Sequence, residues 1–278
     1  LARNMNQPVP GTVKYSAALR PYPNLGTITY RDSSGNATYN ALMVVLERKM
    51  RNGLQFQASH TWAKNLTDTH GEDENGGTLQ NAYNRRADWG NYTAIRHHRF
   101  IFSSVYELPF GAGHKYASSG VMKHVVGGWS FSTFLLLQTG QYFTPSFSGS
   151  DPANVGASSG RPDRIGDGIL SNNSISKWFD SSDFSVPAAN SGRFGNCGVN
   201  ILQGPGTANV DLGLYKNVQF RERFNLRFEA TFTNALNHPN FATPATNIVL
   251  SSVGVISGTQ SMEGSGARTS RVGARLQF

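Results

Sequence analysis

Long stretches of this chain alternate between apolar and polar side chains. In residues 223–235, Phe224, Phe228 and Phe232 share one side of an extended chain with a Leu and an Ala. The positions between them carry Asn, Arg, Glu and Thr. Successive side chains of a strand point to opposite faces. The pattern therefore predicts a β-strand with one apolar face and one polar face.

Seven stretches carry a strand pattern of the length that a tilted barrel strand needs to cross a bilayer, roughly 9 to 11 residues. They are residues 38–49, 53–65, 98–108, 128–141, 208–219, 223–235 and 267–278. Alternation is clear in 53–65 and 267–278 and weaker in 208–219, whereas 128–141 becomes apolar on both faces. We expect a shorter run, "GTITY" at 26–30, to extend the end of a preceding strand.

The connections between these stretches alternate in length. Only "MRN" joins the first two and "FRE" the fifth and sixth, while a medium link containing "PFGAGHKYASSG" joins the third and fourth. The remaining links, residues 66–97, 142–207 and 236–266, are long. Compact soluble domains rarely contain several long structureless connections. Outer-membrane barrels combine short periplasmic turns with long external loops, and the observed order fits that rule.

Alternation with a period of two also occurs in soluble β-sandwiches, so other features must decide what the apolar face contacts. Aromatic residues lie near the expected strand ends, where a girdle at the membrane interface would place them. They are Tyr39, Trp62, Tyr106, Trp129, Tyr142 and Phe278. We therefore predict an all-β fold: an antiparallel up-and-down transmembrane β-barrel segment of about seven to eight strands, a partial barrel with long extracellular loops. The apolar row would face lipid, and the polar row would line a watery lumen.

Composition narrows the classes of function. Only 38% of the 278 residues are hydrophobic, and no run approaches the roughly 18 to 20 apolar residues of a membrane helix. The net charge of +8 is scattered, without the basic helix or stripe of a nucleic-acid-binding protein, so we expect no nucleic-acid partner. The single Cys197 excludes an internal disulfide. Because the sequence opens without Met or a leader pattern, we expect a removed signal or a chain cut from something longer.

Several blocks of the chain are similar to one known family. "YPNLGTITYRDSSGNATYNALMVVLERKMRNGLQFQASHTWAKNLTD" resembles the barrel of Oar-like TonB-dependent outer-membrane receptors. So do "HHRFIFSSVYELPFGAGHKY", "VVGGWSFSTFLLLQTGQYFTP" and "FEATFTNALNHPNFATP". The resemblance begins near residue 20 and reaches the end of the chain. It implies a C-terminal portion, residues 1–278, of a barrel of about 22 strands, with the plug and N-terminal domains absent.

The resemblance also implies a function and a set of partners. The parent protein would be a receptor and transporter in the bacterial outer membrane, taking up an unidentified solute in a TonB-dependent way. No enzymatic activity and no cofactor are implied. The expected partners are outer-membrane lipid and lipopolysaccharide, the missing plug domain, the TonB energy-coupling complex and the barrel-assembly machinery.

The last residues, "RVGARLQF", resemble the terminal strand signal of outer-membrane proteins. That signal has a terminal aromatic residue preceded by alternating apolar positions, here Val272, Ala274, Leu276 and Phe278. The barrel-assembly machinery would read it. The alternative is an ordinary last strand that happens to end in Phe.

No constellation of residues indicates catalysis or metal binding. His60, His70, His97, His98 and the acidic "GEDE" at 71–74 lack the spacing of a known metal site, so no metal is expected. His60 shares its strand face with Phe56 and Trp62, which an interfacial position explains. The glycine-rich loop around Asp163 lacks the ligand spacing of a helix-loop-helix calcium site, and no Gly-x-Ser-x-Gly elbow occurs.

Candidate contact residues fall into two groups. Tyr, Trp and Arg are enriched in binding hot spots, and several occur in the expected external loops. These candidates for ligand binding are Tyr83, Arg85, Arg86, Trp89, Tyr92, Arg161, Arg164 and Trp178, together with Phe179, Phe184 and Arg193. The alternative for "NRRADWGNY" is that it packs one loop onto another. In the lumen, Arg227, Glu229 and Arg275 are expected to contact the plug.

Two other functions remain open at this point. A secreted all-β surface-binding or adhesion protein, built as a sandwich, would bury the row from Phe224 to Phe232 against a second sheet. A small self-contained outer-membrane pore, or a lipid-modifying enzyme on such a barrel, would need an eighth strand from residues 1–30. Pro8, Pro10, Pro21 and Pro23 make that strand difficult.

Overall fold

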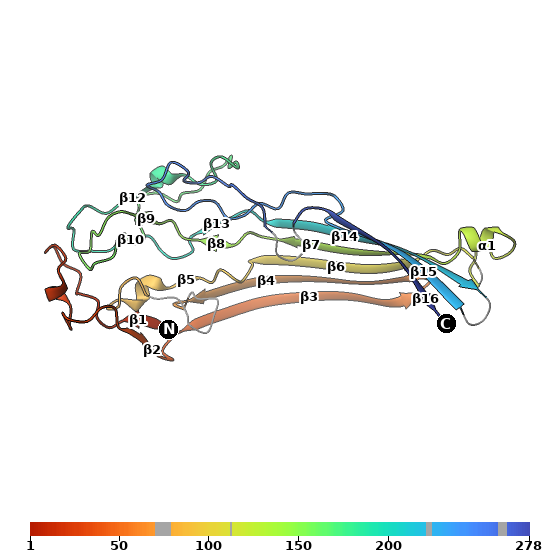
Figure 1. The fold of residues 1–278 in the computed structure, drawn as a ribbon, viewed down its shortest axis with the longest axis horizontal. Coiled ribbons are helices and arrows are strands. Elements are labelled where there is room, and N and C mark those ends of the chain that lie inside the picture. Colours follow the sequence, from red (N-terminus) through yellow and green to blue (C-terminus); the bar gives the residue numbers. More distant parts are fainter. Residues whose placement is uncertain (70–78, 112, 221–223, 261–265) are drawn as a thin grey trace.

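Seven long strands form one antiparallel sheet in the computed structural model, which describes residues 1–69, 79–111, 113–220, 224–260 and 266–278 (Figure 1). The strands are β3 Ala37–Arg51, β4 Leu54–Thr67, β6 His98–Glu107, β7 Trp129–Gln138, β14 Thr207–Phe220, β15 Phe224–Thr233 and β16 Thr269–Gln277. Each pairs with the next in this order, and the two-residue β5 Gly90–Asn91 adds a short pairing to β4. The predicted all-β, up-and-down antiparallel architecture is confirmed, and the long links lie together at one end of the sheet (Figure 1).

The first hairpin shows how local sequence sets the strand pairing. Asn52 and Gly53 form the two-residue turn between β3 and β4, and both have positive φ angles, 53° and 78°. Asn-Gly is the preferred pair for such turns because both residues tolerate the left-handed conformation. The turn is tight enough to leave Arg51 paired with Leu54.

The strands are staggered as in a tilted barrel wall. One row of directly paired residues runs from Phe56 in β4 through Ser104, Thr133, Leu212 and Phe232 to Ser270 in β16. In β4 this row passes two residues from the turn end at Leu54, and in β16 seven residues from the end at Gln277. Between β4 and β16 the stagger therefore averages one residue per strand-to-strand step. With spacings of about 3.3 Å along and about 4.8 Å across the strands, this gives a tilt of about 35°, within the range of outer-membrane barrels.

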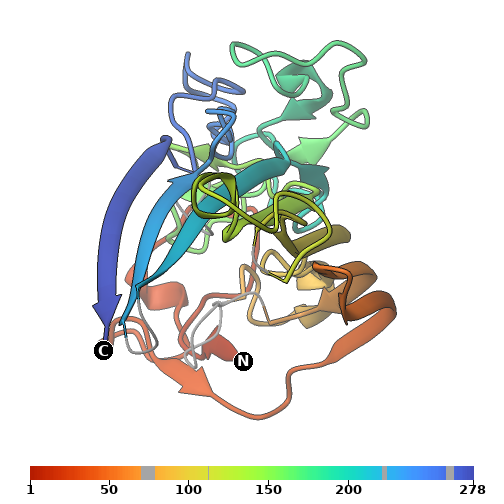
Figure 2. The ribbon, with the colours of Figure 1, turned by 90° about the vertical axis from the view of Figure 1, so that its right-hand side faces the viewer.

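The sheet is curved but does not close. Figure 2 shows the seven strands as one arc, with β3 at one border and β16 at the other. A hollow of about 460 Å³ lies on the face that carries Gln55, Gln57, Ser103 and Asp211, so this polar face is the concave one. We call the opposite face, which carries Phe224, Phe228 and Phe232, the outward face.

Smaller elements lie beyond both ends of the sheet, all of them at the loop end except the helical turn 122–125, which lies at the turn end (Figure 1). The strands are β1 Ala2–Asn4, β2 Thr29–Arg31, β8 Tyr142–Phe143, β9 Phe147–Ser148, β10 Ser159–Gly160, β11 Asp163–Arg164, β12 Phe184–Ser185 and β13 Leu202–Gln203. The helical turns are η1 Ala17–Leu19, η2 Arg85–Asp88, α1 Met122–Val125 and η3 Ser181–Asp183. Among the described residues, no helix combines the length and the apolar content of a membrane span.

The expectation for residues 26–30 is wrong. Instead of extending a longer strand, Thr29–Arg31 pairs with Ala2–Asn4 as a separate two-stranded ribbon. Next to this ribbon, the Leu1 backbone nitrogen donates to the Asp32 carbonyl, and the Asp32 backbone N–H donates to the Leu1 carbonyl. The partner lies outside the local sequence, so alternation within the run could not indicate it.

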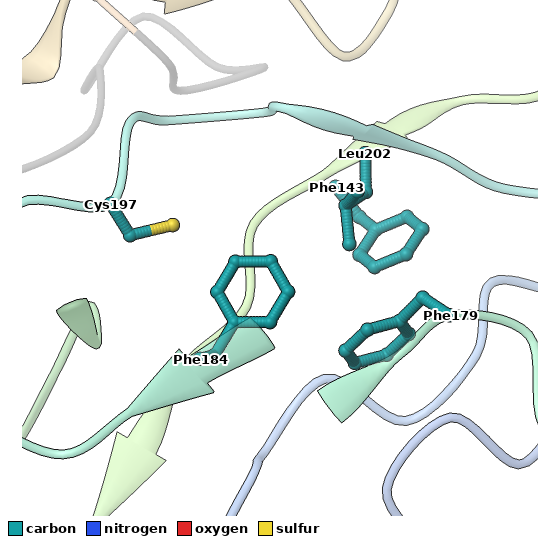
Figure 3. Close-up of a cluster of buried hydrophobic side chains, with 5 residues drawn as sticks. All are labelled: Phe143, Phe179, Phe184, Cys197 and Leu202. Carbon is teal, nitrogen blue, oxygen red and sulfur yellow. The ribbon is translucent and has the colours of Figure 1, made fainter. Parts of the chain in front are cut away.

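The main buried cluster lies among the loops and not under the sheet. Phe143, Phe179, Phe184, Cys197 and Leu202 are each at most 5% exposed and point toward one another (Figure 3). Their rings make tilted and edge-to-face contacts, with centroid distances of 5.6 Å and 6.0 Å. β7 is apolar on both faces, and Leu136 on its concave side is 1% exposed.

Candidate functional site

The outward face leaves its apolar side chains uncovered. Phe224, Phe228 and Phe232 are 42%, 45% and 38% exposed, and no described residue packs a second layer over them. Apolar residues continue across the sheet at paired positions, including Leu42, Val44, Leu46, Phe131, Leu212, Val272 and Leu276. Soluble proteins rarely expose a contiguous apolar surface of this extent. A sandwich would have buried the Phe row, so the adhesion-protein alternative loses its structural basis.

Aromatic residues border this apolar surface at both ends of the strands. Trp62 lies on the outward face near the loop end, while Tyr106 and Trp129 lie near the turn end. Two of the expected girdle residues are elsewhere. Tyr39 pairs with Asn65 on the concave side, and Tyr142 belongs to the β8–β13 ribbon outside the sheet.

The concave face presents a polar hollow with basic residues near its β16 border. Arg227 stacks over the Tyr215 ring at 4.5 Å, and its Nε lies 3.9 Å from a Glu229 carboxylate oxygen. Arg275 is the direct cross-strand neighbour of Arg227. Like charges directly opposite one another are destabilising. Glu229 supplies one negative charge beside these two guanidinium groups.

At the loop end of the sheet, ionic contacts join the external loops to one another. The Arg161 guanidinium forms an ion pair with Asp88 of η2 and donates a further hydrogen bond to the Ala87 carbonyl, 3.0 Å. The backbone N–H of Gln80 donates to the same carboxylate, and the Gln80 side chain accepts from the Arg161 backbone N–H. The side chains of Arg161 and Asp88 are 12% and 5% exposed. This buried pair joins loop 66–97 to loop 142–207.

A second ion pair stabilises loop 142–207 internally. The Arg193 guanidinium donates two hydrogen bonds to the Asp163 carboxylate, each 2.7 Å. These hydrogen bonds lower the pKa of the Asp163 carboxyl, so it stays ionised. Next to it, the Arg164 side chain donates to the Gly166 carbonyl. The basic candidates of this loop are thus held by loop contacts.

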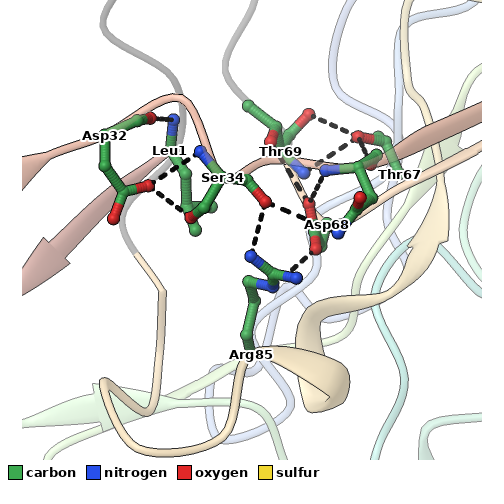
Figure 4. Close-up of polar contacts among 8 residues, drawn as sticks. Leu1, Asp32, Ser34, Thr67, Asp68, Thr69 and Arg85 are labelled. Carbon is green, nitrogen blue, oxygen red and sulfur yellow. Dashed lines mark hydrogen bonds and ion pairs between the residues drawn. The ribbon is translucent and has the colours of Figure 1, made fainter.

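A small pocket of about 430 Å³ brings three of the predicted ligand-binding residues together. Arg85, Arg86 and Trp89 line it with Asn36 and Asp68. Figure 4 shows the Arg85 guanidinium between the Asp68 carboxylate and a carbonyl of the chain before β3. Asp68 is 5% exposed at its side chain and lies 2.9 Å from Arg85 Nε. Its partner Asn36 donates a backbone hydrogen bond of 2.7 Å to it.

The other predicted ligand-binding residues do not join this pocket. The Tyr83 hydroxyl donates to the Gln7 carbonyl, and Tyr92 is held through its backbone N–H to Asn65. Trp178 donates its indole N–H to the Gln203 carbonyl, 2.9 Å, at the outward side of the loops. Phe179 and Phe184 belong to the buried cluster. Sequence patterns missed Asn36, Asp68 and Asp88, whose polar partners are far apart in the chain.

His60, His97 and His98 form a cluster of rings with Trp62. Among the described residues, no group of three or more His, Cys, Asp or Glu side chains is arranged to hold a metal ion. His60 and His98 stack at 5.5 Å, and His98 stacks on Trp62 at 6.4 Å. The Trp62 indole N–H donates to His97 Nε2. His70 and the acidic residues 71–74 lie outside the described residues.

The last strand carries its predicted terminal pattern at the border of the sheet. Val272, Ala274 and Leu276 lie on the outward face of β16, paired with β15. Val272, Leu276 and Phe278 are 85%, 55% and 94% exposed. Packing within the described structure therefore does not explain these apolar residues.

Comparison with known proteins identifies one protein family. A family profile described as "Outer membrane beta barrel domain" matches residues 1–271. Searches of curated proteins and of solved structures gave no match.

Proposed function

The chain belongs to the outer membrane β-barrel domain family, and from that premise we propose that it is the C-terminal barrel portion of an Oar-like TonB-dependent receptor. Membership places it in the bacterial outer membrane. The outward face then contacts hydrocarbon, and the concave face belongs to the lumen. Proteins of this family are generally non-enzymatic, so the proposal contains no chemical step.

One observation carries the proposal: the sheet ends in two unpaired borders, β3 and β16. In hydrocarbon each unpaired backbone N–H or C=O costs several kcal/mol, which only a closed barrel avoids. β3 alone has 15 residues, and almost all of them are exposed. Further strands must therefore complete the wall. We assign them to the preceding part of the same polypeptide, as the resemblance to large receptors implies.

The lumen supports a plug as the partner of the concave face. A plug that carries carboxylates would compensate Arg227 and Arg275, whose guanidinium groups lie on directly paired residues. Glu229 beside them would pair with basic groups of the same plug. The coupling complex would pull on that plug and open a path along the polar hollow.

The external loops would supply the binding surface for the solute. Asp88 and Arg161 hold loops 66–97 and 142–207 in one arrangement. The pocket with Arg85, Arg86 and Trp89 opens on this assembly and combines cationic groups with an aromatic ring. Such a pocket suits an anionic or glycan-like group through hydrogen bonds and stacking.

Cysteine labelling in living cells tests the proposal. Thr231→Cys on the concave face is introduced into the full-length protein, with the buried Cys197 replaced by Ser. A membrane-impermeant maleimide should label Thr231→Cys faster in cells with an active TonB complex than in cells without one. Phe228→Cys on the outward face is the matched control and should stay unlabelled in both. Rapid labelling of Thr231→Cys independent of TonB would indicate an open pore and contradict the proposal.

A further inference from the structure

The outward face contains a cleft where the sheet meets the loops. This lateral cleft has a volume of about 640 Å³, within the usual range for small-molecule sites. It lies on the lipid side of the wall and is separate from the polar hollow of the concave face. The lining residues that matter here are His60, His98, Phe100, Leu137 and Ala208 of the sheet and Trp178 of the loops.

The floor and walls of the lateral cleft are mainly apolar. Phe100, Leu137 and Ala208 are directly paired across three neighbouring strands and form its floor. Pro and aromatic residues of loops 142–207 and 236–266 form the walls. One wall is fixed in position, because the Trp178 indole donates to the Gln203 carbonyl. An apolar, pre-formed cleft that continues a lipid-facing surface fits a hydrocarbon chain.

On β4 the cleft is lined by His60, and beyond it, toward the loops, the outward face of the strand becomes cationic; we call this stretch the rim. Along the outward face of β4, the successive side chains toward the loops are Ala58, His60, Trp62 and Lys64. His98 stacks against both His60 and Trp62 and extends this rim to β6. Imidazole and indole groups suit the membrane interface, and an ammonium beyond them suits the level of lipid phosphates.

We propose that the lateral cleft binds one acyl chain of a lipopolysaccharide molecule, whose phosphate contacts Lys64 and the imidazoles of the rim. The loop end of a barrel faces the cell exterior, so the cleft opens to the outer leaflet, where lipopolysaccharide resides. The site is independent of solute uptake and of the plug. Family membership alone places the residues of the cleft against lipid. The site therefore does not depend on the receptor proposal.

Two variants test the site, each with a matched control. Ala208→Trp fills the floor of the cleft, whereas Ala58→Trp places the same ring on the same face one row outside it. Lys64→Gln removes the rim ammonium, whereas Lys49→Gln removes an exposed ammonium at the turn end. The full-length protein is extracted in mild detergent from outer membranes, and the bound lipopolysaccharide is quantified by native mass spectrometry.

Wild type and both control variants should retain one lipopolysaccharide. Each buried methylene contributes roughly fourfold in affinity, so exclusion of two or more by Ala208→Trp should lower retention by about tenfold or more. Lys64→Gln should weaken retention and raise its sensitivity to salt. Heat-modifiable gel migration verifies that every variant is folded. Equal retention by all five proteins, or retention of phospholipid in place of lipopolysaccharide, would overturn the proposal.

Discussion

Arginine substitutions along β15 test whether its outward face contacts lipid, as we propose. Phe224, Phe228 and Phe232 lie on one outward row and have nearly equal exposure, 42%, 45% and 38%. With a rise of about 3.3 Å per residue and a tilt of about 35°, Phe228 lies about 11 Å and Phe232 about 22 Å above Phe224. An apolar band about 25 Å tall then has Phe228 near its middle and the other two near its edges.

The loss in the free energy of unfolding caused by an arginine on this row should increase with the depth of that position in the bilayer. Phe228→Arg should lower the free energy of unfolding by about 2–4 kcal/mol, the cost of an arginine on the lipid face at the midplane. Phe224→Arg and Phe232→Arg should cost only about 0–1 kcal/mol, because their guanidinium groups reach the interfaces. A difference of about 3 kcal/mol changes the folding equilibrium by more than about a hundredfold.

Urea titration of the full-length protein in phospholipid vesicles measures these costs. Thr231→Arg on the concave face is the control and should change stability little, because its side chain stays in water. If the three Phe residues were buried in an ordinary protein interior, the loss of stability on substitution by Arg would depend on the exposure of each side chain. Their exposures are nearly the same, so the three losses would be similar. Equal costs at the three positions, or the largest cost at an end, would refute the reasoning.

Four further outcomes follow from the loops and the last strand. Because Arg193 holds the folded-state pKa of Asp163 below the unfolded value of about 3.9, the contribution of their ion pair is fully present above that value and is lost as the pH falls through the lower folded pKa. Hydrogen exchange of loop 142–207 should accelerate on acidification in wild type and show no such step in Arg193→Gln; a step of equal size in both would argue against the ion pair. Burial raises the pKa of Cys197 from 9.0 to about 11, so alkylation at neutral pH should be at least about a hundredfold slower than for an unperturbed thiol, and labelling at the free-thiol rate would mean that the loop cluster is open. Arg161→Gln removes the guanidinium that pairs with the buried Asp88 carboxylate, at a cost of up to about 3–5 kcal/mol, and should speed proteolysis between residues 142 and 207, which an unchanged cleavage rate would contradict. Deletion of Phe278 should reduce the amount of protein in the outer membrane without reducing its synthesis, as immunoblots of membrane fractions can show, and unchanged membrane levels would remove the assembly-signal role.

The sheet could be predicted from sequence because its strands repeat one simple constraint. Each has 9 to 15 residues, with one face toward the surroundings and one toward the lumen, so period-two alternation persists long enough to be read. The largest difference between predicted and observed strand ends is at β7, which was predicted to end at residue 141 and ends at Gln138 in the structure. There Gly140 lies so close to the backbone of Gly204 that a Cβ would meet its carbonyl oxygen at 1.8 Å, and the chain leaves the sheet.

The loop assembly could not be predicted, because its contacts join residues far apart in the sequence. Arg161 and Asp88 are separated by 73 positions, and no local pattern pairs a particular Arg with a particular Asp. The strands β8 to β13 have two residues each, too few to show a period. Sequence composition identified Arg85, Arg86 and Trp89 as candidates, but only the fold brings them beside Asn36 and Asp68.

Nitroxide scanning of β15 in membranes tests most directly which face contacts lipid. A spin label is placed in turn at each position from Phe224 to Thr233 of the full-length protein, and its collisions with oxygen and with a water-soluble nickel chelate are measured. Even positions should favour oxygen and odd positions the chelate, with a strict period of two along the strand. Even positions shielded from both reagents would show that the Phe row is sealed inside protein, and the account would be wrong.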